Sequence, residues 1–307
     1  MTTYTAPPDQ TGLILNNGDV LNVNGGGIAT ATTINDGGEV SVFRRGKTID
    51  TTLDNGGRED VLGGGTAVDT TIDSGGSQDV SVGGIAVNTL ISGGSEVVRG
   101  KADVTTINNG GHLSLNQGMT DHTTINSGGV EIVNAMGGRT EARHTTVNTG
   151  GLLDIFSGSA GFTTINDGGL VTGTAGNIVD TRINSGGVLD AKAGVIVTGL
   201  TFGGVDHGVG GLLKLGNPAD LRLSAHGPLH NWQVGDVIDL VNTQVTSVSE
   251  TPDGRLHKVT VKYGNDQTVT YMLSGQEKDT HVAFQSDGHG GTDLILVPVV
   301  GVHDHLG

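Results

Sequence analysis

The sequence predicts an all-β chain: a right-handed parallel β-solenoid of about ten coils of 18–19 residues, followed by a β-rich C-terminal cap. Three observations predict this fold. A Thr-Thr-Ile-Asn-x-Gly-Gly pattern recurs along the chain, Gly accounts for 55 of 307 residues, and no proline lies between Pro8 and Pro218. A short period with turn residues at fixed offsets is typical of stacked coils. Proline is rare wherever every strand donates hydrogen bonds to a ladder.

The repeat is first clear at Thr32–Gly38, and its last clear copy ends at Gly187. The spacings between the second glycines of successive copies are 19, 19, 18, 17, 18, 22, 18 and 18 residues. Such a period is too short for a helix–turn–helix unit, but it holds three short strands and their turns. With neighbouring strands ~4.8 Å apart, ten coils would form a rod on the order of 50 Å long.

Three strands are expected in each coil, with Gly-containing turns between them because Gly adopts positive φ at no steric cost. The first strand should supply an inward apolar row: Ile34, Leu53, Ile72, Leu90, Ile107, Ile125, Val147, Ile165 and Ile183. The second should supply another: Val42, Val61, Val80, Val98, Leu115, Val133 and Ile155. The third strand is less regular, and its best members are Ile49, Val68, Val87 and Val179.

The chain is expected to divide into three parts. Residues 1–11 form a polar lead, 12–205 the repeat domain and 206–307 a β-rich cap and assembly domain. Period-two alternation predicts strands in the last part, at residues 212–215, 236–240, 259–263 and 269–273. The aromatic residues of this part suit a denser core that closes one end of the solenoid: Trp232, Tyr263, Tyr271 and Phe284.

Composition narrows the class of partner. The net charge is −16, which argues against nucleic acid and against anionic membranes. No apolar stretch is long enough to span a bilayer, so no membrane insertion by this chain is expected. The first nine residues lack the basic and apolar regions of a signal peptide. An excised fragment or an export signal at the C-terminus is therefore favoured over a cytosolic protein.

The repeats resemble those of AIDA-type and antigen-43-type self-associating autotransporter passengers. The resemblance covers about residues 12–205, because the order, spacing and residue types of Thr-Thr-Ile-Asn-x-Gly-Gly recur nine times. It implies a bacterial surface or secreted β-helix that mediates adhesion, aggregation or biofilm formation. The resemblance implies no catalytic residues. It also implies that exposed Ser or Thr hydroxyls are candidates for glycosylation.

Two polar rows are the candidate self-association ladder. One row consists of Thr33, Thr52, Thr71, Thr106, Thr124, Thr146 and Thr164. The other consists of Asn35, Asn108, Asn126, Asn148, Asn166 and Asn184. A structural interpretation is that these side chains bond along the axis and satisfy turns. A functional interpretation is an adhesive face on which many weak contacts act together. An ice-binding Thr array is a third and less favoured interpretation.

No catalytic or metal site is expected. An enzyme that acts on polysaccharide needs clustered carboxylates in a groove, whereas Asp and Glu here are spread at repeat positions. Asp287 and Asp293 form a weak calcium candidate in a segment better interpreted as a turn, so the cofactor expectation is none, with calcium left open. The His303-Asp304-His305 segment is interpreted as an exposed tail rather than a metal chelate.

The sequence therefore predicts a non-enzymatic adhesin or biofilm protein, extracellular or at the bacterial cell surface. Its expected partner is itself, with cell-surface glycans as a second class of partner. One alternative is a structural subunit that polymerises end to end into a filament or matrix fibre. A second alternative is a β-helix enzyme that acts on polysaccharide.

Overall fold

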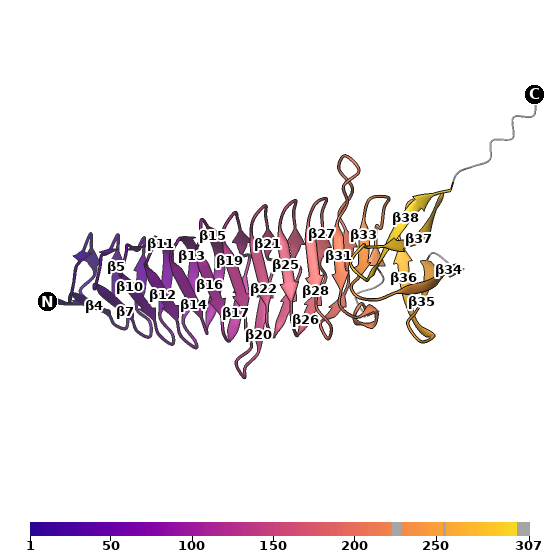
Figure 1. Ribbon diagram of the computed structural model, residues 1–307. Helices are drawn as coiled ribbons and strands as arrows, with labels where there is room; N and C mark the ends of the chain where they lie inside the picture. Colours follow the sequence, from indigo (N-terminus) through magenta and orange to yellow (C-terminus); the bar gives the residue numbers. More distant parts are fainter. Residues whose placement is uncertain (223–228, 254–255, 300–307) are drawn as a thin grey trace, which may run out of the picture.

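The computed structural model describes residues 1–222, 229–253 and 256–299. These residues form an elongated stack of coils with the N-terminus at one end and an antiparallel unit at the other (Figure 1). No α-helix occurs among them, and the single helical turn described is η1 (Pro218–Asp220). No helix in the described part of the chain is long and apolar enough to cross a membrane. The His303-Asp304-His305 segment lies outside the described residues.

One face of the stack is a sheet of fifteen strands, of which all but the last two run parallel. Its parallel strands are β1 (Thr3–Ala6), β4 (Val20–Val23), β7 (Glu39–Val42), β10 (Arg58–Val61), β12 (Ser77–Val80), β14 (Ser95–Val98), β16 (His112–Leu115), β19 (Val130–Val133), β22 (Leu152–Ile155), β25 (Leu170–Gly173), β28 (Val188–Ala191), β31 (Leu212–Leu215) and β33 (Val237–Leu240). We call this surface the long-sheet face.

Two further parallel ladders complete each coil. After the turn that follows the long sheet come β2 (Gln10–Thr11), β5 (Ile28–Thr30), β8 (Lys47–Ile49), β17 (Gly118–Asp121), β20 (Thr140–Arg143), β23 (Ser159–Gly161), β26 (Asn177–Val179) and β29 (Ile196–Thr198). Next come β3 (Ile14–Leu15), β6 (Thr33–Ile34), β9 (Thr52–Leu53), β18 (Thr124–Ile125), β21 (Thr146–Val147), β24 (Thr164–Ile165), β27 (Arg182–Ile183) and β30 (Thr201–Phe202). In three coils the two segments merge into β11 (Thr66–Ile72), β13 (Ile85–Ser92) and β15 (Lys101–Asn108). The predicted parallel β-solenoid is thus confirmed, with about eleven coils.

The predicted inward rows are buried, with one correction. The Val-rich row of the long sheet is fully buried, and so is the Ile-rich row apart from Leu90. Leu90 is 38% exposed, and Ile91 takes the inward position because it pairs with Ile72 and Ile107. That coil contains Thr-Leu-Ile where its neighbours contain Thr-Thr-Ile. Because two apolar residues are adjacent there, the sequence does not indicate which of them points inward.

The third strand has the opposite register from the one its apolar residues suggest. Its expected members Ile49, Val68, Val87 and Val179 lie at outward, half-buried positions. The inward position is the preceding residue, which is small in most coils: Ala29, Thr48, Ala67, Ala86, Ala102, Thr120, Ala142, Ala160, Ile178 and Val197. A small side chain fits there because the opposite rows already fill the narrow interior with Val, Ile and Leu.

The two glycines of each repeat are needed for different reasons. Gly56 has φ +78°, a left-handed conformation that side chains rarely adopt. Gly57 has no positive φ, but a Cβ atom there would lie 2.1 Å from the carbonyl oxygen of Ile34 in the preceding coil. The first glycine therefore turns the chain, and the second lets successive coils approach.

The N-terminal residues are part of the stack. Residues 1–11, expected as a polar lead, contain β1 and β2, which pair in parallel with β4 and β5. At the other end, β31 and β33 continue the parallel long sheet past the boundary expected at residue 205. The division between repeat domain and cap stays a prediction.

The C-terminal unit is built from antiparallel strands, and two of the strands expected from the alternation, at residues 259–263 and 269–273, lie in it. The antiparallel strands are β34 (Val245–Asp253), β35 (Leu256–Tyr263), β36 (Gln267–Ser274), β37 (Thr280–Ser286) and β38 (Thr292–Pro298), and the short β32 (Leu229–His230) joins β36 to the solenoid. Trp232 and Tyr271 are buried, and each donates a hydrogen bond to a carbonyl, that of Asp236 and that of Pro218 respectively. Phe284 is 43% exposed and lies outside this core.

Candidate functional site

The predicted Thr row forms one outward line along the solenoid. Its members are half-buried, and they stack in register from β6 through β9, β11, β15, β18 and β21 to β24. The residue before each of them, such as Thr32 or Thr51, points inward and is buried. Leu90 interrupts the Thr row in one coil and Arg182 ends it.

The Asn row bonds along the axis of the stack. The Asn row forms an unbroken series of four bonds at 2.7–2.8 Å, in which the Nδ2 atom donates to the Oδ1 atom of the Asn one coil earlier. The donors are Asn184, Asn166, Asn148 and Asn126, and the series ends at Asn108. Asn35 makes the same bond to Asn16 at 2.9 Å. Between these two parts, Asp54, Asp73 and Ser92 occupy the row. The axial bonding that the sequence suggested is therefore present, and each amide presents its remaining hydrogen-bonding groups outward.

A third row, at the corner before the Thr row, was missed by the sequence reasoning. Its residues adopt positive φ although none is Gly: Ala31, Asp50, Asp69, Asn88, Val104, His122, His144, Phe162 and Asp180. We call this set the corner row. A signal was available, because each is the residue immediately before Thr-Thr or its equivalent, and Asp, Asn and His are enriched in left-handed conformations.

The corner row brings together two histidines that looked scattered in the sequence. The rings of His122 and His144 stack with centroids 4.9 Å apart, and Phe162 stacks on His144 at 5.0 Å. The Nδ1 atoms of His122 and His144 lie 3.3 Å and 2.7 Å from Oδ1 of Asp121. The intervening coil has 22 residues, but its extra length bulges at the turn between β19 and β20, so the corner stays in register (Figure 1).

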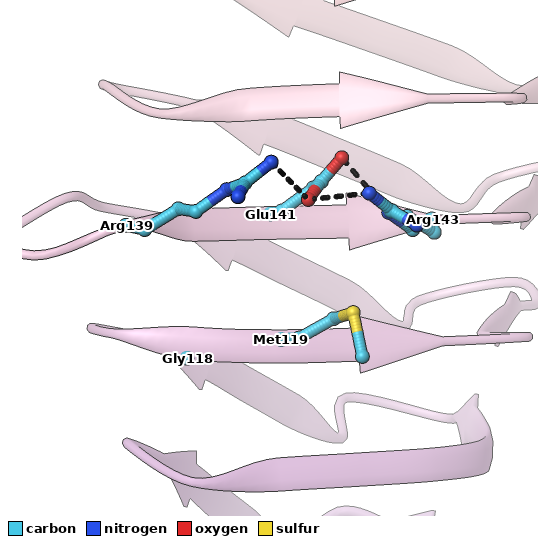
Figure 2. Close-up of a pocket in the computed structure, with 5 residues that line it drawn as sticks. All are labelled: Gly118, Met119, Arg139, Glu141 and Arg143. Carbon is cyan, nitrogen blue, oxygen red and sulfur yellow. Dashed lines mark hydrogen bonds and ion pairs between the residues drawn. The ribbon is translucent and has the colours of Figure 1, made fainter.

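A shallow hollow of about 290 Å³ lies beside this cluster. Figure 2 shows that Glu141, on β20, lies between Arg139 and Arg143, above Met119 of β17. The carboxylate of Glu141 is 3.8 Å from Arg139 and 2.8 Å from Arg143. Two arginines face one carboxylate, so the lining carries a net positive charge, and its single carboxylate is not the pair that glycoside hydrolysis uses.

The calcium candidate does not form a three-ligand group. Asp287 lies in the turn between β37 and β38, where its Oδ1 accepts hydrogen bonds from the backbone of His289 and Gly291 at 2.7 Å and 2.9 Å. These bonds, that from His289 above all, lower the pKa of Asp287. Asp293 lies on β38 opposite Gln285. The turn interpretation is confirmed, and calcium binding there stays a prediction.

Comparison with known proteins gives a family match and matches among solved structures. A family model described as the adhesin of the bacterial autotransporter system, probable stalk, matches residues 10–57. Among solved structures, the chain is similar to the crystal structure of a TibC-catalysed hyper-glycosylated TibA fragment, residues 55–350, with a TM-score of 0.59. The two are 30% identical over 74% of this chain and 90% of that fragment. No curated protein matches the chain.

The fold, the repeat and these matches define a class of protein, the β-solenoid adhesin passengers of bacterial autotransporters. The chain belongs to the AIDA family of such adhesins. The predicted resemblance is thereby confirmed, and membership places the chain among bacterial cell-surface passengers.

Proposed function

We propose that this chain is a non-enzymatic adhesin whose outward Thr and Asn rows pair with the same rows on another copy of the chain. The partner is therefore the chain itself, and the result is lateral aggregation of cells that display it. The observation that carries this proposal is the regular line of half-buried hydroxyl and amide groups repeated one coil apart.

Repetition is what would make such a surface adhesive. A single Thr or Asn contact between two exposed surfaces contributes little, because both groups exchange hydrogen bonds with water. Many equivalent contacts on two rigid rods act at high effective concentration once the first has formed. The Thr side chains from Thr106 to Thr164 and the Asn side chains from Asn108 to Asn166 are neutral, so this part of the strip offers a path for close approach between two chains that each carry a net charge of −16.

Cell-surface glycans are a second class of partner under this proposal. The TibA fragment in the matching structure is hyper-glycosylated. The outward hydroxyls of this chain would, by analogy, either carry sugars or bind them. Hydrogen-bonding rows with free donors and acceptors suit both roles.

Disulfide trapping tests the lateral interface, because the chain has no cysteine of its own. Thr124→Cys and Thr146→Cys place single thiols on the Thr row, and the two variants are oxidised separately and mixed to allow for shifted registers. The controls Ser114→Cys and Thr172→Cys lie at outward, half-buried positions on the long-sheet face. A disulfide requires Cα atoms within about 7 Å. We expect disulfide-linked dimers from the Thr-row variants. Equal yields of such dimers from the control variants would contradict the proposal.

The alternative is a structural subunit that polymerises end to end, with the parallel sheets of successive chains pairing edge to edge. Electron microscopy of the purified chain separates the two modes. End-to-end assembly predicts fibres one rod wide that lengthen with concentration, and lateral assembly predicts side-by-side pairs and bundles.

A further inference from the structure

The cluster at Asp121, His122 and His144 has a geometry that the adhesive rows do not explain. Three potential ligand atoms, one carboxylate oxygen and two imidazole nitrogens, lie within 4.8 Å of one another. It is the only such group of three among the described residues. Each histidine is held in the left-handed region, at φ 55° and 49°, by the corner of its own coil.

The backbone on either side fixes these positions. The N–H of His122 donates to the carbonyl of Arg143 at 3.1 Å, and the N–H of His144 donates to that of Gly161 at 3.0 Å. Asp121 pairs in register with Arg143 on β20. Phe162 stacks on His144 from the following coil. The three ligands therefore come from two adjacent coils whose relative position the ladders determine.

The geometry points to a binding site for one divalent transition-metal ion of the zinc class, held by Asp121, His122 and His144. Imidazole and carboxylate together suit Zn²⁺, Ni²⁺ and Cu²⁺ rather than Ca²⁺ or Mg²⁺. Metal bonds of about 2.0–2.2 Å place ligand atoms up to ~4 Å apart. The Nδ1-to-Oδ1 distances of 3.3 Å and 2.7 Å already fall within that limit.

Two side chains have the freedom to complete the site. His122 and His144 are 61% and 45% exposed, so small ring rotations bring both nitrogens onto one ion. Asp103, on β15 in the preceding coil, has a carboxylate oxygen 3.7 Å from Nδ1 of His122 and is available as a fourth ligand. The remaining coordination positions face solvent, where water or a ligand from another molecule can bind.

Calorimetric titration of the full chain with ZnCl₂ tests this site, in a background where His303 and His305 are changed to Ala to remove the histidines of the terminal segment. We expect one saturable site per chain. His144→Asn and His122→Asn should weaken it by at least the ~10–100-fold that loss of an outer-shell partner alone costs. Asn is chosen because it tolerates positive φ, and Asn88 occupies the same row.

His207→Ala is the matched control, because His207 forms a similar exposed pair with Asp206 at 2.6 Å but has no second imidazole beside it. Zinc affinity should not change in this variant. A second readout is the visible spectrum of Co²⁺ bound in place of zinc, which should show nitrogen ligation in the parent and lose it in His144→Asn. Absence of saturable binding, or unchanged affinity and Co²⁺ spectrum in His144→Asn, would overturn the assignment.

Discussion

At the scale of single residues, the core contains an interior polar row that the repeat does not require. Glu59, Gln78, Glu96 and Glu131 occupy an inward position of the long sheet where Val40, Leu113 and Leu153 lie in other coils. Thr48 and Gln78 donate hydrogen bonds to Glu59, each at 2.7 Å. Both carboxyl oxygens of Glu96 lack such a partner among the described residues.

Burial decides the charge of these groups. It raises the pKa of Glu96 to about 8, with a further contribution from the charges of Glu131 and Glu59. It raises the pKa of Glu131 to about 7, although a hydrogen bond from Thr120 opposes the shift. Glu96 is therefore protonated at neutral pH. An ionised carboxylate in its place would lack both solvent and a donor.

The stability of the solenoid should consequently fall as pH rises. The folded-state pKa of Glu96 lies above the ordinary value of 4.5, so the folded chain keeps a proton that the unfolded chain has lost. The stabilising contribution is complete below about pH 4.5 and is lost as pH rises through about 8. Urea unfolding at pH 5 and pH 8 measures the difference.

Glu96→Leu should reduce this pH dependence and raise the free energy of unfolding at pH 8 by about 1–3 kcal/mol, the desolvation cost of an unpaired buried polar group. Leu113 shows that the position accepts Leu. Exposed Glu39→Leu, on the same sheet, is the control and should leave the pH dependence unchanged. If the free energy of unfolding of Glu96→Leu changes with pH as steeply as that of the parent, groups other than Glu96 cause the pH dependence.

The second glycine of the repeat gives another prediction at this scale. Gly57→Ala should destabilise the chain by at least roughly 1–3 kcal/mol, because its Cβ would lie 2.1 Å from the Ile34 carbonyl oxygen and coils would separate. Gly161→Ala is the control, since the nearest atom to its Cβ is 4.0 Å away. Thermal unfolding of both variants measures the effect, and equal losses would contradict this account of coil packing.

At the scale of elements, the residues of the Asn ladder differ in the number of ladder hydrogen bonds that they make. Asn148 both donates to Asn126 and accepts from Asn166, whereas Asn35 has one ladder bond. At about 0.5–1.5 kcal/mol per net hydrogen bond, Asn148→Ala should cost about 1–3 kcal/mol of unfolding free energy, and Asn35→Ala roughly half. Denaturant unfolding of the two variants tests this, and equal costs would mean that the bonds do not act as a ladder.

The inward faces of strands were predicted correctly where apolar and polar residues alternate clearly. They were predicted poorly where the residues on the two faces of a strand are similar in polarity. The Val row from Val42 to Ile155 and the C-terminal strands were predicted because apolar and polar positions alternate clearly. The third strand was misread because its inward residue is a small Ala or Thr and its outward residue is a larger Val or Ile. Size complementarity across a thin core, rather than hydrophobicity, sets that register.

The site was partly predictable for a related reason. Thr33, Asn35 and their equivalents recur at fixed offsets, so their stacking follows from the period. The corner row does not recur by residue type, and its members meet only because every coil adopts the same left-handed turn. The joining of His122 to His144 across a 22-residue coil also depends on the extra residues bulging at the turn between β19 and β20, ahead of the corner.

At the scale of the whole molecule, charge opposes the proposed lateral assembly. Two chains with a net charge of −16 repel each other at low ionic strength. The screening length falls from about 10 Å at 0.1 M salt to about 3 Å at 1 M. Light scattering should therefore show stronger association as NaCl rises over this range. Weakening with salt would instead indicate that opposite charges form the contact.

Sedimentation velocity over a concentration series tests the central claim, that the outward Thr and Asn rows form the self-association surface, most directly. The parent is compared with Thr124→Lys/Thr146→Lys/Thr164→Lys, and with Ser114→Lys/Thr172→Lys on the long-sheet face as control. We predict that the parent and the control shift to faster-sedimenting species as concentration rises, and that the Thr-row variant stays monomeric. Association of the Thr-row variant equal to that of the parent would contradict the claim.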